Sequence, residues 1–157
     1  MGEPVSVSRE IPASPERLYA MVSDVTRMGE WSPECEGGQW LGGATAAAPG
    51  AKFKATNRVG KKSWKTVSVV VDAEPGRRFS FVVTAGPMKV ADWSYTFEAA
   101  PFGCLVTESW DDRRPGWFKS VTGLATGVRD RPAHNRRGMQ QTLANLAHAA
   151  ESSPDPG

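Results

Sequence analysis

Residues 5–16, VSVSREIPASPE, are the most informative stretch for the fold, because a strand pattern is followed directly by the start of a helix. Valines alternate with serines at the beginning of this stretch, and a period of two predicts a strand over residues 5–11. Ser14 can then cap a helix, Pro15 suits the first helical position, and Glu16 adds an acid to the first turn. We therefore expect a short edge strand followed at once by a helix.

A second short helix is expected at residues 26–31, because the Ser32-Pro33 pair would stop it. A glycine pair, Gly37-Gly38, then precedes a short strand at 39–41, and further strands continue to residue 111. The turns between these strands contain glycine or proline and lie at 59–61, 74–76, 86–87 and 101–103. Closely spaced strands joined by tight turns predict an antiparallel meander.

The last periodic segment is a helix at about 132–151, where Met139, Leu143 and Leu146 fall on one apolar stripe. The segment before it, 117–128, also has helical spacing and includes Phe118, but its glycines weaken it. We expect an α+β fold, in which a curved antiparallel β-sheet is wrapped around the long C-terminal α-helix. Two short helices follow the first strand, and a pocket remains between the sheet and the last helix.

The bulk composition fits one domain spanning residues 1–157, with a core at about 4–151 and a flexible tail at 152–157. Lys and Arg number 19 against 17 acids, and a formal net charge of +2 argues against a nucleic-acid partner. The arginine pairs Arg113-Arg114 and Arg136-Arg137 are expected to be solvated. Because no signal peptide or long apolar run is present, we expect a cytoplasmic protein without stable membrane insertion.

Neither a metal site nor a cofactor is indicated. Cys35 and Cys104 lie far apart, without a CxxC motif or a histidine at ligand spacing, so two free thiols are favoured while a disulfide stays open. The sequence also lacks a Ser/His/Asp order, a phosphate-binding glycine loop and a pair of catalytic carboxylates. The function must therefore be sought in the pocket.

The walls of that pocket follow from sorting each strand by side-chain direction. Lys52 and Lys54 should face solvent, which turns Phe53 and Asn57 inward. For residues 63–73 the phase is ambiguous, and we place the Trp64 face inward. The aromatic side chains predicted on the inner face are Phe53, Trp64, Phe79, Phe81, Trp93, Tyr95, Phe97 and Trp110. Aromatic residues at strand spacing more often fill a core, but a sheet curled around one helix leaves volume that is hard to fill.

Glu108 is the sharpest candidate for chemistry, because its strand position places a carboxyl group on the inner face between Val106 and Trp110. Burial of a carboxylate is costly unless the group is paired, protonated or bound. Glu108 could anchor a polar ligand group or act as an acid or base. Alternatively, it could pair with an arginine or accept a hydrogen bond from a tryptophan or asparagine. Tyr95 and His134, the latter near the pocket mouth, are the other candidates for moving a proton.

Several stretches carry a family resemblance: IPASPE at 11–16, MGEWSPEC at 28–35, GAKF at 50–53, AEPGRRF at 73–79, VTESW at 106–110, and HNRRGM at 134–139 with Thr142-Leu143. With them the chain resembles the SRPBCC superfamily, also called START-like or birch-pollen-allergen-like, and within it the actinobacterial polyketide cyclase/dehydrase proteins. The resemblance covers about residues 4–151. It implies a helix-grip fold with a deep cavity for a lipid, sterol, polyketide or other aromatic metabolite. It carries over no catalytic residue, since the motifs of characterised cyclases have no clear counterpart here.

Three functions stay open at this point. The first is binding of a bulky hydrophobic small molecule by a monomer or homodimer, and the expected ligand-binding residues are Trp31, Phe53, Asn57, Trp64, Phe81, Trp93, Tyr95, Glu108, Trp110, Phe118, Asn135 and Met139. The alternative is a polyketide cyclase- or dehydratase-like enzyme that uses Glu108, Tyr95 or His134 as an acid or base. The third is a regulatory or toxin-like interaction protein.

Overall fold

The computed structural model describes residues 4–128 and 130–152 of the chain. The elements in order are β1 (Val5–Ile11), α1 (Pro15–Ser23), the 3-10 helix η1 (Val25–Glu30), β2 (Cys35–Leu41), β3 (Lys52–Val59), β4 (Lys62–Glu74), β5 (Arg78–Ala85), β6 (Met88–Ala100), β7 (Gly103–Asp112), α2 (Gly116–Thr126) and α3 (Arg131–Ser152). Ser152 therefore ends α3 rather than starting a flexible tail, and the rest of the predicted tail lies outside the described residues.

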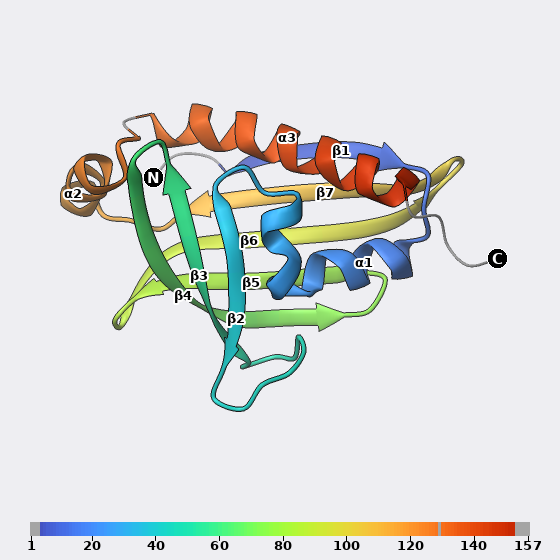
Figure 1. The fold of residues 1–157 in the computed structure, drawn as a ribbon, viewed down its shortest axis with the longest axis horizontal. Coiled ribbons are helices and arrows are strands. Elements are labelled where there is room, and N and C mark those ends of the chain that lie inside the picture. The colour runs from blue at the N-terminus through green and yellow to red at the C-terminus, as the bar shows by residue number, and fades with distance from the viewer. Residues whose placement is uncertain (1–3, 129, 153–157) are drawn as a thin grey trace.

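All the strands form one antiparallel sheet of seven, in the order β1-β7-β6-β5-β4-β3-β2. The sheet curves so that α3 lies along β1 and β7, while α1 and η1 pack near β2 and the middle strands (Figure 1). This arrangement confirms the predicted α+β, helix-grip fold. In the described part of the chain, no helix is both long and apolar enough to cross a membrane.

The start of α1 is the capped helix that the sequence predicts. The Ser14 hydroxyl accepts a hydrogen bond from the Arg17 backbone N–H at 3.2 Å, and Pro15 occupies the first helical position. One face of the helix is buried, with Leu18 fully enclosed. Because α1 follows β1 after only a few residues, it is held against the adjacent end of the sheet.

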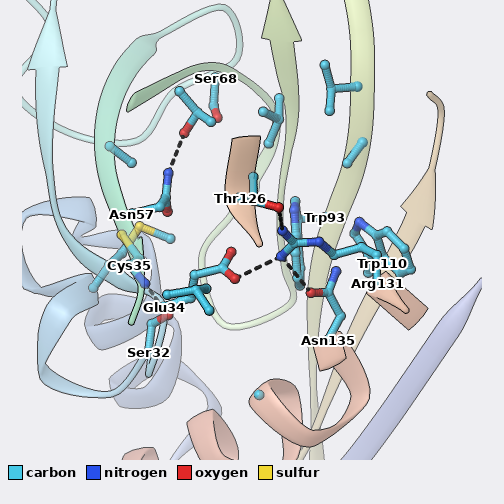
Figure 2. A pocket seen from close by; sticks show the side chains of 18 of the residues that line it. Ser32, Glu34, Cys35, Asn57, Ser68, Trp93, Trp110, Thr126, Arg131 and Asn135 are labelled. Atoms are coloured by element: carbon cyan, nitrogen blue, oxygen red, sulfur yellow. Dashed lines mark hydrogen bonds and ion pairs between the residues drawn. The ribbon is translucent and has the colours of Figure 1, made fainter. Parts of the chain in front are cut away.

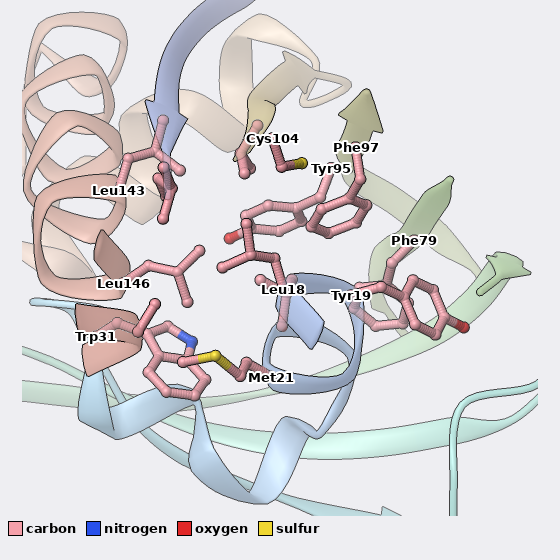
Figure 3. Close-up of a cluster of buried hydrophobic side chains, with 14 of the residues drawn as sticks. Leu18, Tyr19, Met21, Trp31, Phe79, Tyr95, Phe97, Cys104, Leu143 and Leu146 are labelled. Carbon is pink, nitrogen blue, oxygen red and sulfur yellow. The ribbon is translucent and has the colours of Figure 1, made fainter. Parts of the chain in front are cut away.

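The hydrophobic core fills the space between α1, α3 and that end of the sheet (Figure 3). Phe79 is completely buried there, and Phe97 packs edge-on against Tyr19 with ring centroids 5.9 Å apart. Both phenylalanines were expected on the wall of the pocket, and that expectation is wrong. The strand alternation correctly turns them inward, but α1 covers this part of the inner face.

The glycine pair Gly37-Gly38 lies within β2 rather than before it, and one of the two glycines has a packing role. Gly37 and Gly38 lie inside a strand that begins at Cys35, earlier than the expected 39–41. A Cβ atom added to Gly38 would lie 2.7 Å from the carbonyl oxygen of Val25, whereas one added to Gly37 would meet nothing within 4 Å. Gly38 therefore allows β2 to approach η1 closely.

This difference gives a matched pair of variants. We expect Gly38→Ala to lower the free energy of unfolding by about 1–3 kcal/mol, because the new methyl group would push β2 away from η1. Gly37→Ala adds the same methyl group to the same strand without a clash and should leave stability nearly unchanged. Urea unfolding of both variants measures the difference, and equal losses would contradict the assigned close approach of Gly38.

The short helix α2 confirms the helical segment predicted before α3, but its apolar residues point in two directions. Phe118 is half-buried and faces the interior, whereas Trp117, Val121 and Leu124 are exposed. At the end of the helix, Lys62 of β4 donates to the carbonyl oxygen of Leu124 at 3.4 Å. This contact places α2 beside the β3–β4 hairpin, at the end of the sheet away from α1 (Figure 1).

Candidate functional site

A cavity of about 730 Å³ lies between the concave face of the sheet, α3 and α2. Ligand pockets in proteins measure roughly 300–1,000 Å³, so this volume suits a bulky small molecule. The structure brings every residue that the sequence nominated for ligand binding or proton transfer onto its wall, namely Trp31, Phe53, Asn57, Trp64, Phe81, Trp93, Tyr95, Glu108, Trp110, Phe118, His134, Asn135 and Met139. That these residues bind a ligand stays a prediction.

Aromatic rings form much of the cavity wall. Trp93 of β6 and Trp110 of β7 lie opposite one another in the sheet register, with ring centroids 6.3 Å apart. Phe53 of β3 and Phe81 of β5 meet edge-on at 5.1 Å. The tryptophan pair arises because directly opposed residues on adjacent strands share one face of the sheet, whereas the two phenylalanine rings meet across β4, which lies between their strands.

The burial of its side chains shows which face of β4 points inward, a question that the sequence left ambiguous. Ser68 and Val70, which share the Trp64 face, are each 1% exposed, whereas Val67 and Val71 on the other face are 37% and 50% exposed. The inward placement of the Trp64 face is therefore confirmed. Asn57, on the neighbouring strand, donates from its amide to the Thr66 hydroxyl at 3.2 Å, so this stretch of the wall has polar groups.

Glu108 is buried in the wall of the cavity, with only 3% of its surface exposed. The Tyr95 hydroxyl donates to its Oε2 atom at 2.8 Å, and Oε1 has no hydrogen-bond partner among the described residues. Burial raises the pKa of Glu108 to about 8, against a smaller lowering by the Tyr95 hydrogen bond. The expected partners of this carboxyl, an arginine, tryptophan or asparagine, are wrong, because its partner is a tyrosine.

Tyr95 completes this pair from the adjacent strand, where it lies directly opposite Glu108 in the register. Burial, reinforced by the neighbouring Glu108, holds the pKa of the phenol well above its usual value of 10. At neutral pH the pair therefore consists of a neutral phenol and a mostly protonated carboxyl group. Such a pair can donate a hydrogen bond, and the carboxyl group can give up a proton.

A polar cluster, which the sequence did not reveal, lies at the start of α3 (Figure 2). The Arg131 guanidinium donates to Glu34 Oε1 at 2.8 Å, to Thr126 Oγ1 at 3.0 Å and to Asn135 Oδ1 at 3.3 Å. It also lies over the Trp64 ring, 5.8 Å from the centroid. These contacts tie the junction of α2 and α3 to β4 and to the residues before β2.

His134 lies in the first turn of α3 on the cavity wall, as predicted. Its Nε2 atom is 3.1 Å from Glu34 Oε1, the oxygen that also accepts from Arg131. This bond fixes the histidine ring in the polar cluster, and a role in proton transfer stays a prediction.

One further residue departs from its expected surroundings, and the state of the two cysteines is resolved. Arg114 is buried rather than solvated, because Asp112 binds its guanidinium at 2.8 Å, and both charges are screened from water. The two cysteines are free within the described residues, so the alternative of a disulfide is wrong. Cys35 also lines the cavity, and burial raises the pKa of its thiol, which reduces its reactivity.

Comparison with protein families matches residues 4–151 to the family described as polyketide cyclase / dehydrase and lipid transport. Comparison with curated protein sequences finds no match.

Similar folds occur among solved structures. A polyketide-cyclase-like protein from Corynebacterium glutamicum is 31% identical, with a TM-score of 0.62 over 94% of this chain and 91% of its own. A protein from Chromobacterium violaceum is 17% identical, with a TM-score of 0.71 over 98% of this chain and 100% of its own. An AHSA1-like protein from Aeromonas hydrophila is 18% identical, with a TM-score of 0.65 over 96% of this chain and 94% of its own. The last two show the fold alone. From the family match and the Corynebacterium relative, the chain belongs to the polyketide cyclase / dehydrase and lipid transport family, of the SRPBCC type.

Proposed function

We propose that the protein binds a bulky hydrophobic small molecule, such as a lipid, a polyketide or an aromatic metabolite, in the cavity between the sheet and α3. The observation that carries this proposal is the cavity of about 730 Å³ with tryptophan and phenylalanine rings in its wall. Apolar walls with a few placed polar groups are typical of small-molecule sites. The family's description, which includes lipid transport, agrees with such a role.

Native mass spectrometry of the freshly purified chain tests the proposal. We expect an additional mass that organic extraction removes or, for protein isolated empty, quenching of tryptophan fluorescence by an apolar probe such as fluorene. Ala55 is 6% exposed and lines the cavity from β3, so Ala55→Trp should fill the site and abolish both signals. Ala99→Trp, at an exposed position of β6, is the matched control and should bind normally. Equal binding by the two variants would place the ligand elsewhere.

A polyketide cyclase- or dehydratase-like activity is the second candidate, and the protonated Glu108 beside Tyr95 favours it. A buried acid with a pKa near neutrality is suited to general acid–base catalysis, which typically contributes ~10²–10⁴-fold to a rate. Replacement of Glu108 by Gln would then abolish turnover while binding is largely kept. Unchanged turnover would remove Glu108 from any catalytic role.

A further inference from the structure

The Glu108 carboxyl group has one satisfied and one unsatisfied oxygen. Tyr95 can donate one hydroxyl hydrogen, and that hydrogen goes to Glu108 Oε2. Oε2 therefore acts as the carbonyl-type oxygen of the acid, which leaves the acid proton on Oε1. Oε1 is buried without a partner among the described residues, and Glu108 is one of the residues that line the cavity. A buried donor without an acceptor is costly, and a bound molecule can supply the missing acceptor.

The surroundings of Glu108 restrict what that molecule can present. On β1 the residue opposite Glu108 is Val7, and on β6 it is Tyr95. The other titratable or charged side chains of the cavity wall are Glu34, Cys35, Arg58, Lys65, Arg114, Arg131, His134 and Arg137. Glu34 is bound to Arg131, Arg114 to Asp112, and Arg58 to Glu36. Burial disfavours charge at Glu108 itself, and it would equally disfavour a charged ligand group placed beside it.

We propose that Glu108 is the polar recognition residue of the cavity, where its Oε1–H donates to a neutral acceptor oxygen on an otherwise apolar ligand. This inference rests on the proposed function and narrows it. The ligand class is a ketone, quinone, lactone or alcohol with a bulky hydrocarbon body, bound with its oxygen against β7. Simple hydrocarbons lack the acceptor, and ligands with an ammonium or carboxylate group at this point would bring an unpaired charge into a buried site.

Fluorene and 9-fluorenone form a matched pair of probes, because the second differs only in a carbonyl group in place of a CH₂. Titrations followed by tryptophan fluorescence would compare them on the wild-type chain, Glu108→Gln and Glu108→Leu. At about pH 6 we expect the wild-type chain to bind fluorenone roughly tenfold more tightly than fluorene, the value of one net hydrogen bond. As the pH rises from about 8 to about 10 this preference should fall away, because Glu108 then loses its proton.

The two variants show whether the preference for fluorenone comes from a hydrogen bond or from the shape of the cavity. Glu108→Gln keeps an N–H donor, so it should keep the preference for fluorenone at every pH. Glu108→Leu should bind both probes equally, and the carbonyl stretch of bound fluorenone should lie at higher wavenumber than in the wild-type complex. If the wild-type chain binds both probes with equal affinity, the acceptor proposal is wrong while the binding function stands. If neither probe nor any other apolar compound binds, both are wrong.

Discussion

Glu108→Gln is expected to gain stability over the wild-type chain as the pH rises, on the order of 3 kcal/mol between about pH 5 and about pH 8. In the folded protein burial raises the pKa of Glu108 from 4.5 to about 8, so over this interval the folded state holds a proton that the unfolded state releases. Raising the pH therefore favours unfolding of the wild-type chain. Below about pH 4.5 both states are protonated and the contribution vanishes. Glutamine cannot titrate and escapes this loss.

Urea unfolding at several pH values, followed by circular dichroism, measures this effect as the difference between variant and wild type. The stability of the variant must be compared with that of the wild-type chain at each pH, because other groups titrate in both proteins and change both stabilities. Glu98→Gln removes a carboxyl group from an exposed position of β6 and is the matched control. If the difference in the free energy of unfolding between Glu108→Gln and the wild-type chain stays constant with pH, the carboxyl group is not desolvated in the folded protein.

Phe79→Ala and Trp93→Ala should differ in the property that they impair, which is mainly stability for Phe79→Ala and mainly ligand binding for Trp93→Ala. Phe79 is fully buried in the core, so its truncation should cost about 3–5 kcal/mol without changing the affinity for an apolar probe. Trp93 is half-buried and lines the cavity, so its removal should cost less stability, because it enlarges a space that already exists. Its loss should weaken binding of an aromatic probe roughly tenfold through the missing ring contact.

Urea unfolding and fluorene titration of both variants test this contrast. Phe79 and Trp93 lie on adjacent strands, two positions apart in the register because Phe81 is the residue opposite Trp93, which makes them a fair comparison of core with wall. Equal losses of stability with no change in binding would mean that the inward aromatic rings all serve as core.

The strands and their faces could be predicted because side-chain direction alternates locally along each strand. That rule places Phe53, Trp93, Trp110 and Glu108 inward, and it divides the side chains of β4 between two faces, of which the Trp64 face is the inner one. The capped helix after β1 is likewise a local pattern. These features need no knowledge of which segments meet in space.

The polar cluster could not be predicted, since its partners come together only through the curvature of the sheet. Arg131 and Glu34 are 97 positions apart in the chain, and nothing near either residue signals the other. The same holds for Phe79, whose place in the core depends on where α1 packs. Arg114 was misjudged because its neighbour Asp112, two positions away, neutralises a charge that otherwise would remain in solvent.

The location of a bound probe within the molecule tests the account most directly. Isotope-filtered NOE spectra of the labelled chain with fluorene would report which methyl groups lie beside the ligand. We expect contacts to the methyl groups of Ala55, Ala91 and Met139, which line the cavity from β3, β6 and α3. Contacts confined to the exposed side chains Val121 and Leu124 of α2, or to Val71 on the outer face of the sheet, would contradict binding in the cavity.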